Sequence, residues 1–366
     1  MVRFGIVGFG IMGKNHARSF WGGQIPGAVL SAVCDTDPAA LAFAKENDAN
    51  IKTFDNISAM LGSGEIDAVL VATPHYDHPI IAMEAMEKKI HVLIEKPAGV
   101  FTKNVREMNK KAETAGVEFG IMYQTRTNPV YQKMREMVQN GELGAIRRTS
   151  WLITDWYRSQ AYYDNGGWRA TWGGEGGGVL INQCPHNLDL WQWICGMPKR
   201  VTAFAQNGKW HDIEVEDDVT AYVEYENGAT GIFVTCTADC PGNNRFEVLG
   251  DLGKLVCEGG SKLTHFKLNV SEREFNITNT DMWATPKVDV TELDCPGDFP
   301  QHPEVIRAFV RKINGEGELV AGGEEGIHGL TLSNAMHLSS WLGKTVELPM
   351  DEDLFLAELE KLQRKA

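Results

Sequence analysis

The chain has 366 residues, 43% of them hydrophobic and 23% charged, which is typical of a globular protein with more than one domain. Acidic residues outnumber basic ones by 49 to 35, giving a formal net charge of −14 without any basic block, so nucleic acids and anionic membranes are not expected partners. The seven cysteines form no C-x-x-C pair, and no segment resembles a signal peptide or a membrane span, so we expect reduced thiols, no metal and a cytoplasmic location.

The N-terminus predicts a dinucleotide-binding turn. A short apolar strand at residues 3–7 leads into GFGIMG, whose glycines at 8, 10 and 13 fit G-x-G-x-x-G before a helix. The first glycine permits a tight turn, the second lets the backbone approach a pyrophosphate, and the third lets helix and strand pack closely. We therefore expect the whole turn to bind the cofactor: Gly8, Phe9, Gly10, Ile11, Met12 and Gly13.

A second apolar strand, AVLSAVCD, ends at Asp35. This carboxylate lies about 20 residues beyond the turn, which is where an acid that binds the ribose 2′-hydroxyl is expected. A 2′-phosphate would meet a like charge there, and no Arg follows closely to offset it. We therefore predict NAD as the cofactor in preference to NADP.

Strands and helices continue to alternate as far as residue 122, which predicts a doubly wound parallel sheet. The strands DAVLVAT and HVLIEK flank one helix, and a further helix is expected over residues 102–115, with Thr102 as its N-cap, before the strand EFGIM. Ligands bind beyond the carboxyl ends of such strands, where the stretches ATPHYDH and EKPAG fall. The expected cofactor contacts there are Thr73, Pro74, His78, Glu95 and Lys96.

Lys96 is the ionisable group that we expect nearest the nicotinamide. It follows a buried strand, and Pro97 fixes the chain direction directly after it. The alternative is a structural lysine that holds Glu95 or a backbone carbonyl.

The domain border is predicted at residues 125/126, followed by a crossover helix from Pro129 to about Asn140 and the strand IRRTSWLI. The next stretch, residues 154–178, is long for a loop and rich in Trp, Tyr and Gly, which indicates a binding segment or lid. Aromatic faces suit sugar rings, so Trp156, Tyr157 and Tyr162 are candidate substrate contacts; each could equally pin the loop or fill a subunit contact.

The stretch GGGVLINQCPHNLDLWQW predicts a helix that starts after three glycines and contains Pro185. Its spacing places Asn182 and His186 on one polar face, aimed at the substrate, while the glycines leave room for the cofactor. Further along, segments between residues 200 and 259 alternate in period two with turns at Gly228 and Gly253, which predicts an antiparallel meander with one face suited to an oligomer interface.

Late helices are expected around residues 302–314 and 324–342. His328 and His337 are expected in helix packing or on the surface, without a carboxylate at metal-ligand spacing.

Together, GFGIMG, the acid-ended second strand, ATPHYDHP, HVLIEKP and GGGVLINQCPHNLDL resemble the glucose-fructose oxidoreductase/inositol dehydrogenase (Gfo/Idh/MocA) family over nearly the whole chain. The resemblance implies an NAD(P)-dependent sugar or polyol oxidoreductase, with an α/β Rossmann domain at 1–125 and an α+β domain at 126–366. The second domain would carry an open, mostly antiparallel sheet that packs against another subunit.

The resemblance also carries roles onto residues. It assigns catalysis to Lys96 and His186, placed across the nicotinamide from each other, and brings Trp168 and Arg169 near the cofactor. Family dehydrogenases commonly have Asp where this chain has Asn182; an amide can orient a hydroxyl or an imidazole but cannot take a proton. The expected substrate contacts are Tyr123, Arg126, Trp156, Tyr157, Tyr162, Asn182, Gln183 and His186.

The sequence therefore predicts hydride transfer between NAD and a secondary alcohol of a sugar, glycoside or cyclitol, with Lys96 as general base or acid. One alternative is oxidation of a glycoside at C3, or reduction of a 3-ketosugar, with tightly held NAD. Another, of a different class, is a regulator that senses the dinucleotide without chemistry; the presence of both Lys96 and His186 argues against it.

Overall fold

The computed structural model describes residues 1–364. Its contacts divide the chain into two compact units. Unit 1 comprises residues 1–127, 174–176 and 300–330, and unit 2 comprises residues 128–173, 177–299 and the remainder from 331. The chain thus returns to its first unit twice, which the sequence pattern did not predict.

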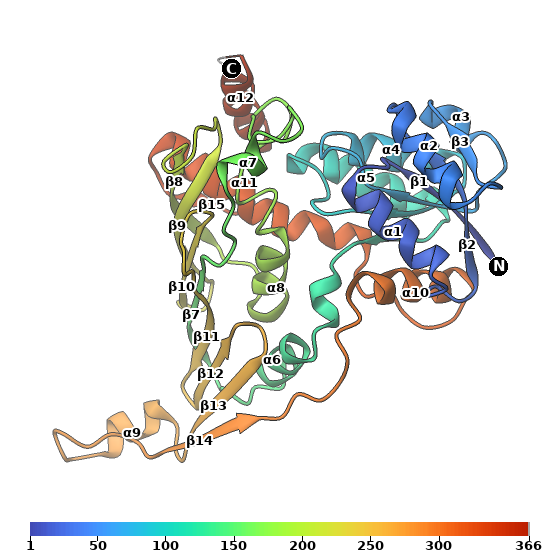
Figure 1. The fold of residues 1–366 in the computed structure, drawn as a ribbon. Helices are drawn as coiled ribbons and strands as arrows, with labels where there is room; N and C mark the ends of the chain where they lie inside the picture. Colours follow the sequence, from blue (N-terminus) through green and yellow to red (C-terminus); the bar gives the residue numbers. More distant parts are fainter. Residues whose placement is uncertain (365–366) are drawn as a thin grey trace. The chain divides into compact units, whose positions relative to one another are not determined.

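Unit 1 contains a six-stranded parallel sheet of order β3-β2-β1-β4-β5-β6 (Figure 1). The neighbours β1 and β4 mark the point where the strand order reverses, so their carboxyl ends define the edge at which such sheets bind ligands. Its strands are β1 (Val2–Val7), β2 (Ala28–Cys34), β3 (Lys52–Phe54), β4 (Ala68–Val71), β5 (His91–Ile94) and β6 (Phe119–Ile121). The predicted doubly wound sheet is confirmed.

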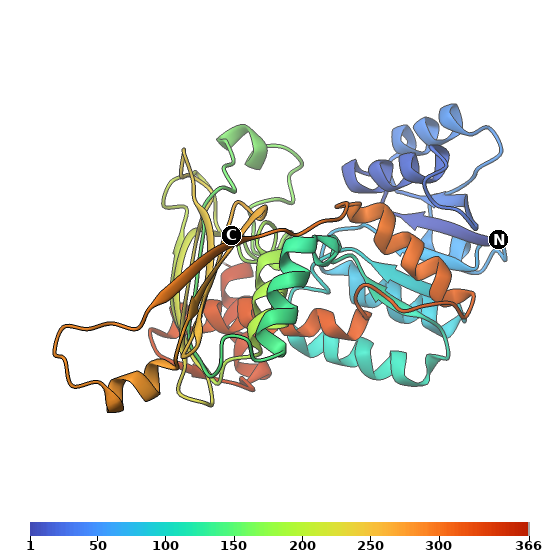
Figure 2. The same cartoon turned by 90° about the horizontal axis from the view of Figure 1, so that it is seen from below.

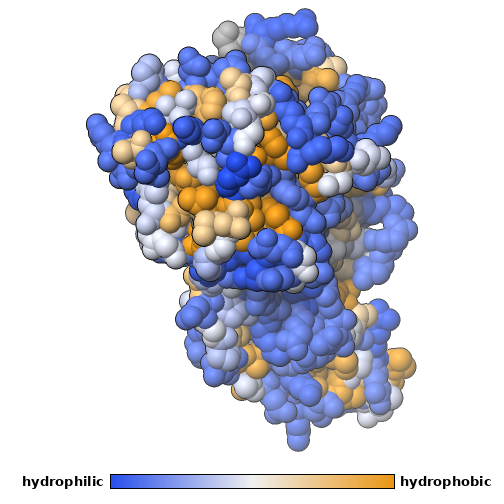
Figure 3. All heavy atoms as spheres, turned by 90° about the vertical axis from the view of Figure 1, so that its right-hand side faces the viewer, coloured by the Kyte–Doolittle hydropathy of each residue, from blue (hydrophilic) through white to orange (hydrophobic). Residues whose placement is uncertain are grey.

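Helices cover both faces of this sheet. They are α1 (Ile11–Trp21), α2 (Pro38–Asn47), α3 (Ile57–Leu61), α4 (Asp77–Glu87), α5 (Thr102–Ala115) and α10 (Gln301–Ile313), with short 3₁₀ turns η1 (Gln124–Thr127) and η2 (Gly323–Glu325). Helix α5 has its predicted bounds, but Phe101 occupies the N-cap and Thr102 is already its first residue, so the predicted cap was wrong by one position. Unit 1 presents patches of apolar side chains between hydrophilic ones in Figure 3.

The core of unit 1 needs both parts of the chain. Phe4 and Ile6 of β1 pack in one apolar cluster with Ile306 and Phe309 of α10, all four fully buried. Helix α10 also contacts α1, on the same face of the sheet. The late helix around residues 302–314 is therefore confirmed, and it completes the nucleotide-binding unit.

Unit 2 is built on a nine-stranded sheet of order β14-β13-β12-β11-β7-β10-β9-β8-β15 (Figures 1 and 2). The strands are β7 (Ile146–Ile153), β8 (Arg200–Asn207), β9 (Glu216–Glu224), β10 (Thr230–Cys236), β11 (Asn244–Gly250), β12 (Gly253–Glu258), β13 (Lys262–Leu268), β14 (Val288–Leu293) and β15 (Val346–Glu347). The helices are α6 (Pro129–Gln139), α7 (Gln160–Tyr163), α8 (Pro185–Cys195), α9 (Glu272–Thr278), α11 (Gly326–Leu342, which starts in unit 1) and α12 (Glu352–Gln363).

The mostly antiparallel sheet is confirmed, but it is not a simple meander. Strand β7 lies between β10 and β11, running parallel to the first and antiparallel to the second. Insertion of this early strand separates two strands that follow each other in the chain, and no local pattern in their own sequences encodes that.

One face of the nine-stranded sheet carries helices and the other is open. Fully buried side chains such as Trp151, Phe233 and Phe246 point into the core, where Trp151 and Phe246 stack with ring centroids 4.3 Å apart. The alternate positions remain exposed, among them Phe204, Tyr222, Ile232 and Leu249. Residues 1–364 contain no helix with the length and apolar character that crossing a membrane requires.

Candidate functional site

The glycine turn of unit 1 has the backbone geometry of a phosphate cradle. Gly8 has φ +85°, and a Cβ there would lie 2.5 Å from the carbonyl oxygen of Ala72. A Cβ on Gly13 would lie 2.1 Å from the carbonyl oxygen of Gly8. Gly10, the N-cap of α1, has no atom within 4 Å of such a Cβ. The turn is therefore packed against protein at its ends and open in its middle, which fits a dinucleotide pyrophosphate at the helix N-terminus.

Asp35 stands directly after β2, where the sequence predicted it. Its Oδ2 accepts the N–H of Phe9 at 2.5 Å and its Oδ1 accepts the N–H of Asp37 at 2.8 Å, so the carboxylate braces the glycine turn and keeps one further acceptor site on each oxygen. A cavity of about 600 Å³ opens here, bordered by Gly8, Asp35 and Thr73. Its other charged lining residues are Asp55, Asp77 and Glu84.

Lys96 follows β5 at the carboxyl edge of the sheet, and its neighbours are firmly held. The buried Glu95 accepts the N–H of Lys96 at 3.1 Å, while its other oxygen lies 2.6 Å from Nε2 of His16 on α1. Burial alone would raise the pKa of Glu95, but the hydrogen bond and charge of His16, with His302 and Lys96, outweigh it and lower that pKa to about 2. The backbone of the candidate catalytic lysine is thereby anchored to an ionised, buried carboxylate.

His78, a predicted cofactor contact, is held by backbone groups of its own unit. Its ring is buried, with Nδ1 2.8 Å from the carbonyl oxygen of Pro97 and Nε2 2.9 Å from that of Thr73. Both ring nitrogens thus face backbone carbonyls, and burial lowers the pKa of the imidazole despite them, so the neutral ring donates to one of the two. His78 joins the two loops predicted to contact the cofactor, while Thr73 and Pro74 line the cavity.

Tyr123 and Arg126, two predicted substrate residues, have partners inside unit 1. The Tyr123 hydroxyl donates to the carbonyl of Gly326 at 3.5 Å. Arg126, which is 2% exposed, lies over the Tyr123 ring and pairs with Glu325 at 2.7 Å. These contacts support a structural role for both residues in tying the returning segment to the sheet.

In unit 2, two predicted substrate residues, Asn182 and Gln183, and the predicted cofactor residue Arg169 gather around the hydroxyl of Tyr162. This oxygen lies 2.9 Å from a guanidinium nitrogen of Arg169, 3.3 Å from Nδ2 of Asn182 and 3.4 Å from Nε2 of Gln183. Each of these groups donates a hydrogen bond to it. Residues from the aromatic loop and from the glycine-rich segment, predicted separately, therefore form one cluster of donors around a hydroxyl oxygen.

The other aromatic residues of the loop differ in their surroundings. Nε1 of Trp156 donates to Oδ1 of Asn187 at 3.0 Å, beside His186, so Trp156 pins the loop to α8. Tyr157 is 51% exposed. The guanidinium of Arg169 lies 4.7 Å from the Trp168 ring centroid and 4.9 Å from that of Tyr162. These two cation–π contacts restrict the position of the Arg169 side chain.

The glycine-rich segment departs from its predicted form. Residues 177–184 form turns, and α8 begins only at Pro185, which occupies the first helical position. A proline is favoured there because its missing N–H would have no intrahelical partner, so the predicted proline inside a helix was wrong. Asn182 and His186 are consequently held by separate elements, a turn and a helix start, and His186 is buried.

Two buried side chains that support these elements, His16 and Glu216, were missed from the sequence, and a third, His337, was given no role beyond helix packing or the surface. Glu216 and His337 are fully buried, with Nε2 of the histidine 3.0 Å from the carboxylate. The run of three acids that opens the strand EDDVTAYVE is the signal that could have flagged Glu216, because such a run is unusual where a sheet begins to bury its residues. His337 lies in helix packing, which was one of the two predicted options.

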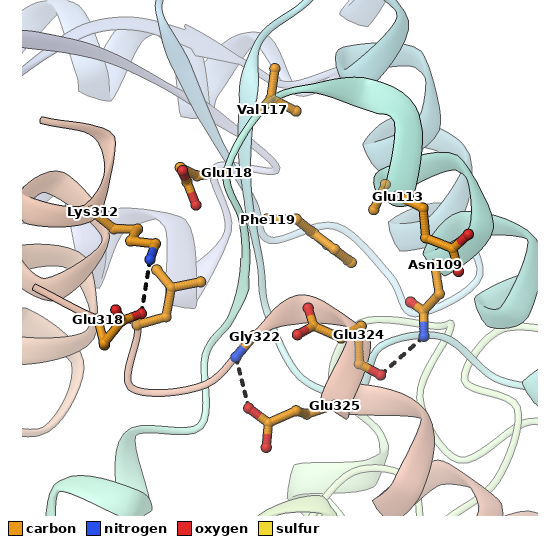
Figure 4. Close-up of a pocket in the computed structure, with 12 residues that line it drawn as sticks. Asn109, Glu113, Val117, Glu118, Phe119, Lys312, Glu318, Gly322, Glu324 and Glu325 are labelled. Atoms are coloured by element: carbon orange, nitrogen blue, oxygen red, sulfur yellow. Dashed lines mark hydrogen bonds and ion pairs between the residues drawn. The ribbon is translucent and has the colours of Figure 1, made fainter. Parts of the chain in front are cut away.

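A second cavity in unit 1, of about 460 Å³, lies by residues 117–119, where β6 begins (Figure 4). Several of its polar groups pair with one another. Lys312 pairs with Glu318 at 2.8 Å, Asn109 donates to the carbonyl of Glu324 at 3.0 Å, and the N–H of Gly322 donates to Glu325 at 2.9 Å (Figure 4). Parallel sheets bind ligands beyond the carboxyl ends of their strands, so this cavity is not the candidate site.

Two family models match the chain. Residues 2–123 match the oxidoreductase family with an NAD-binding Rossmann fold (GFO_IDH_MocA), and residues 131–256 match the GFO/IDH/MocA C-terminal domain. The first match covers nearly all of the predicted cofactor domain, and the second covers the predicted substrate domain as far as residue 256.

Relatives align with nearly the full length. The chain is similar to the WlbA dehydrogenase of Chromobacterium violaceum, solved with NADH and UDP-GlcNAcA, at a TM-score of 0.82 and 29% identity over 96% of each chain. It is 24% identical to 1,5-anhydro-D-fructose reductase of Ensifer adhaerens, over 95% of this chain and 99% of that one. It is 27% identical to D-glucoside 3-dehydrogenase of Escherichia coli K12, over 87% and 90% respectively.

Proposed function

This chain belongs to the Gfo/Idh/MocA family of oxidoreductases, and we propose that it transfers a hydride between NAD and a secondary alcohol of a sugar, glycoside or cyclitol. The observation that carries the proposal is the donor cluster around the Tyr162 hydroxyl, made by Arg169, Asn182 and Gln183. A site that directs three donors at one hydroxyl oxygen is chemically suited to the hydroxyl groups of a carbohydrate. The names of the relatives, which act on sugars, point to the same substrate class.

Oxidation of an alcohol requires that the hydroxyl proton be removed while the hydride leaves carbon. NAD would accept the hydride when bound. Lys96 in its neutral form takes the proton on Nζ, and its backbone is held by Glu95. His186 and Asn182 orient the reacting hydroxyl, and the amide of Asn182 takes no proton itself. The reverse reaction uses Lys96 as the acid.

We propose NAD as the cofactor in preference to NADP. The cavity beside the glycine turn is lined by the acids Asp35, Asp55, Asp77 and Glu84, and its lining residues include no Lys or Arg. A 2′-phosphate there would meet like charges without an offsetting cation. Binding of NADH, measured by fluorescence, is expected to exceed that of NADPH by at least about tenfold; equal binding would contradict this.

The same proposal assigns residues 1–125 to cofactor binding and residues 126–366 to substrate binding and self-association. The open sheet face supports association, because Phe204, Tyr222 and Ile232 remain exposed on neighbouring strands. A cytoplasmic location is supported by the seven cysteines, all free thiols and mostly buried.

The test is a screen of inositols, glycosides and ketosugars with NAD⁺ and NADH, followed at the nicotinamide absorbance band. Inclusion of glycosides and 3-ketosugars separates oxidation at C3 from oxidation of free polyols. Lys96→Ala is expected to bind NADH as the wild type does but to lose turnover by about three orders of magnitude or more.

The matched control is Lys111→Ala, at a partly exposed lysine on α5 that pairs with Glu87. It should leave turnover unchanged. Turnover of Lys96→Ala near that of the control would show that Lys96 takes no part in the chemistry. If the wild type binds the cofactor but turns over no compound, the alternative of a regulator that senses the dinucleotide without chemistry would be favoured.

A further inference from the structure

One buried glutamate captures three consecutive backbone amides of the glycine-rich segment. Glu216 stands at the start of β9 with no exposed surface. Its Oε2 accepts the N–H of Gly178 at 2.9 Å, its main-chain carbonyl accepts that of Val179 at 3.0 Å, and its Oε1 accepts that of Leu180 at 3.0 Å. A single residue of the sheet therefore fixes three consecutive amides of the turn that leads to Asn182.

His337 completes the arrangement from α11. Its Nε2 lies 3.0 Å from Oε2 of Glu216, and its ring stacks on Trp341 at 5.4 Å with an interplanar angle of 11°. Trp172 packs edge-on against the same ring at 5.5 Å. The histidine is thus locked between two indole rings, with no exposed surface.

The glycines of the segment make room for this pair. A Cβ on Gly177 would lie 3.0 Å from the His337 ring, and one on Gly178 would lie 2.0 Å from the carbonyl oxygen of Glu216. In unit 2 the space that these two glycines leave is filled by the protein itself. This corrects the expectation that the run gives room to a cofactor.

We propose that Glu216 and His337 are positioning residues that fix the segment 177–186, so that Asn182 and His186 are held where the proposed hydride transfer needs them. The expected effect of this pair on kcat rests on the proposed function. The backbone after the captured amides continues the constraint, since the N–H of Asn182 bonds to the carbonyl of Gly178 and that of Cys184 to the carbonyl of Val179. Displacement of the first turn would therefore move the helix start that carries His186.

The charge of Glu216 depends on its partner. Burial opposes its ionisation, but the charge and hydrogen bond of His337, with the amides of Leu180 and Gly178, outweigh it and lower the pKa of Glu216. Asp217, the next acid, bonds instead to the amides of residues 209–211 and to His211, so it serves a different loop. A carboxylate with a lowered pKa loses its contribution as the pH falls through that pKa.

The first experiment compares Glu216→Gln with wild type. Glutamine offers one acceptor oxygen in place of two, so one of the amides of Gly178 and Leu180 loses its partner. We expect hydrogen–deuterium exchange of peptides covering residues 177–186 to rise about tenfold or more, and kcat to fall by about the same factor. The KM for NAD⁺ should stay within about twofold, because the cofactor turn belongs to the other unit.

The matched control is Asp251→Asn. Asp251 also accepts a backbone amide, that of Ala145, and the hydroxyl of Ser271, but it lies in the β11–β12 turn, away from the segment. It should unfold more easily than wild type while kcat and exchange of residues 177–186 stay unchanged. A fall in kcat equal to that of Glu216→Gln would show that general destabilisation suffices, and would overturn the proposal.

A second variant tests positioning through pH. His337→Phe keeps the stack on Trp341 but removes the imidazole that lowers the pKa of Glu216, so that pKa should rise. The acid limb of the kcat profile should then move to higher pH. An unmoved acid limb, or unchanged exchange in Glu216→Gln, would refute the proposal. If the wild type oxidises no polyol at all, the proposed function fails, while the exchange measurement still decides the role of Glu216.

Discussion

The two glycine runs of this chain look alike in sequence but serve opposite purposes. In the run at residues 8–13, Gly10 faces open space, with no atom within 4 Å of the place that a Cβ would take. In the run at 176–178, every such place is filled: by Val100 for Gly176, by His337 for Gly177 and by Glu216 for Gly178. The first run is filled at both ends and leaves space only at its middle glycine, where we propose that the cofactor binds, whereas the second lets the protein's own groups approach its backbone throughout. A glycine-rich motif near an active site is therefore not by itself a ligand contact.

The runs nevertheless share a supporting device, a buried glutamate–histidine pair. His16 and Glu95 lie beside the first run and anchor one amide, that of Lys96. His337 and Glu216 lie beside the second and anchor three. Because the second pair anchors more amides, we expect substitutions beside it to lower the stability of the fold more than substitutions beside the first pair.

The largest effect is expected for Gly178→Ala. Its Cβ would lie 2.0 Å from the carbonyl oxygen of Glu216, a backbone atom that cannot yield. Overpacking of this kind costs about 3 kcal/mol, which lowers Tm by roughly 6–12 °C in a domain of this size. Circular dichroism during heating measures it. Gly173→Ala, where nothing lies within 4 Å, is the control, and an equal loss in that variant would contradict the explanation.

The next effect concerns the stability of the fold at acid pH and tests the pair of His16 and Glu95 in unit 1. Because the pKa of Glu95 is lowered to about 2, this group stabilises the fold above its ordinary value of 4.5, and that contribution is lost as the pH falls from 4.5 towards 2. His16→Gln removes the positive partner, so the pKa rises and acid unfolding should begin about one pH unit higher. A fluorescence titration of unfolding from pH 6 to pH 2 measures the shift, and coincident curves would exclude the ion pair as the cause.

The smallest effect on stability is expected for Gly10→Ala. The added methyl group meets no protein atom, so Tm without cofactor should remain within about 2 °C of wild type. NADH binding should weaken about tenfold or more, because the methyl group occupies space that the pyrophosphate needs. Unchanged affinity would mean that the open middle of the turn is not where the phosphates bind.

The sequence was most informative where spacing is local. The positions of Gly8, Gly10, Gly13 and Asp35 predicted a turn and an acid that the structure joins through one hydrogen bond to Phe9. The aromatic loop and the glycine-rich segment were both recognised as candidate substrate elements, and Tyr162 brings them together. The local pattern was enough to predict the glycine turn and Asp35, because the residues of a strand–turn–helix unit contact one another within a short stretch of chain.

What the sequence could not predict depends on distant partners. Glu216 meets amides 36 to 38 residues earlier in the chain, and His337 reaches it from a helix more than 100 residues later. The start of α8 at Pro185 follows from this tertiary anchoring, which holds the preceding residues in turns although their spacing favours a helix. The placement of β7 between β10 and β11 likewise arises from pairing that no local period encodes.

The contribution of α10 to the first unit has a consequence for biosynthesis. Phe309 is fully buried and its ring lies 6.2 Å from that of Phe4, so the apolar surface of β1 stays uncovered until the ribosome has released residues beyond 310. A fragment that ends at Thr127 would retain the glycine turn but expose that surface. Such a truncated product should aggregate, and supplying the α10 peptide in trans should restore its solubility.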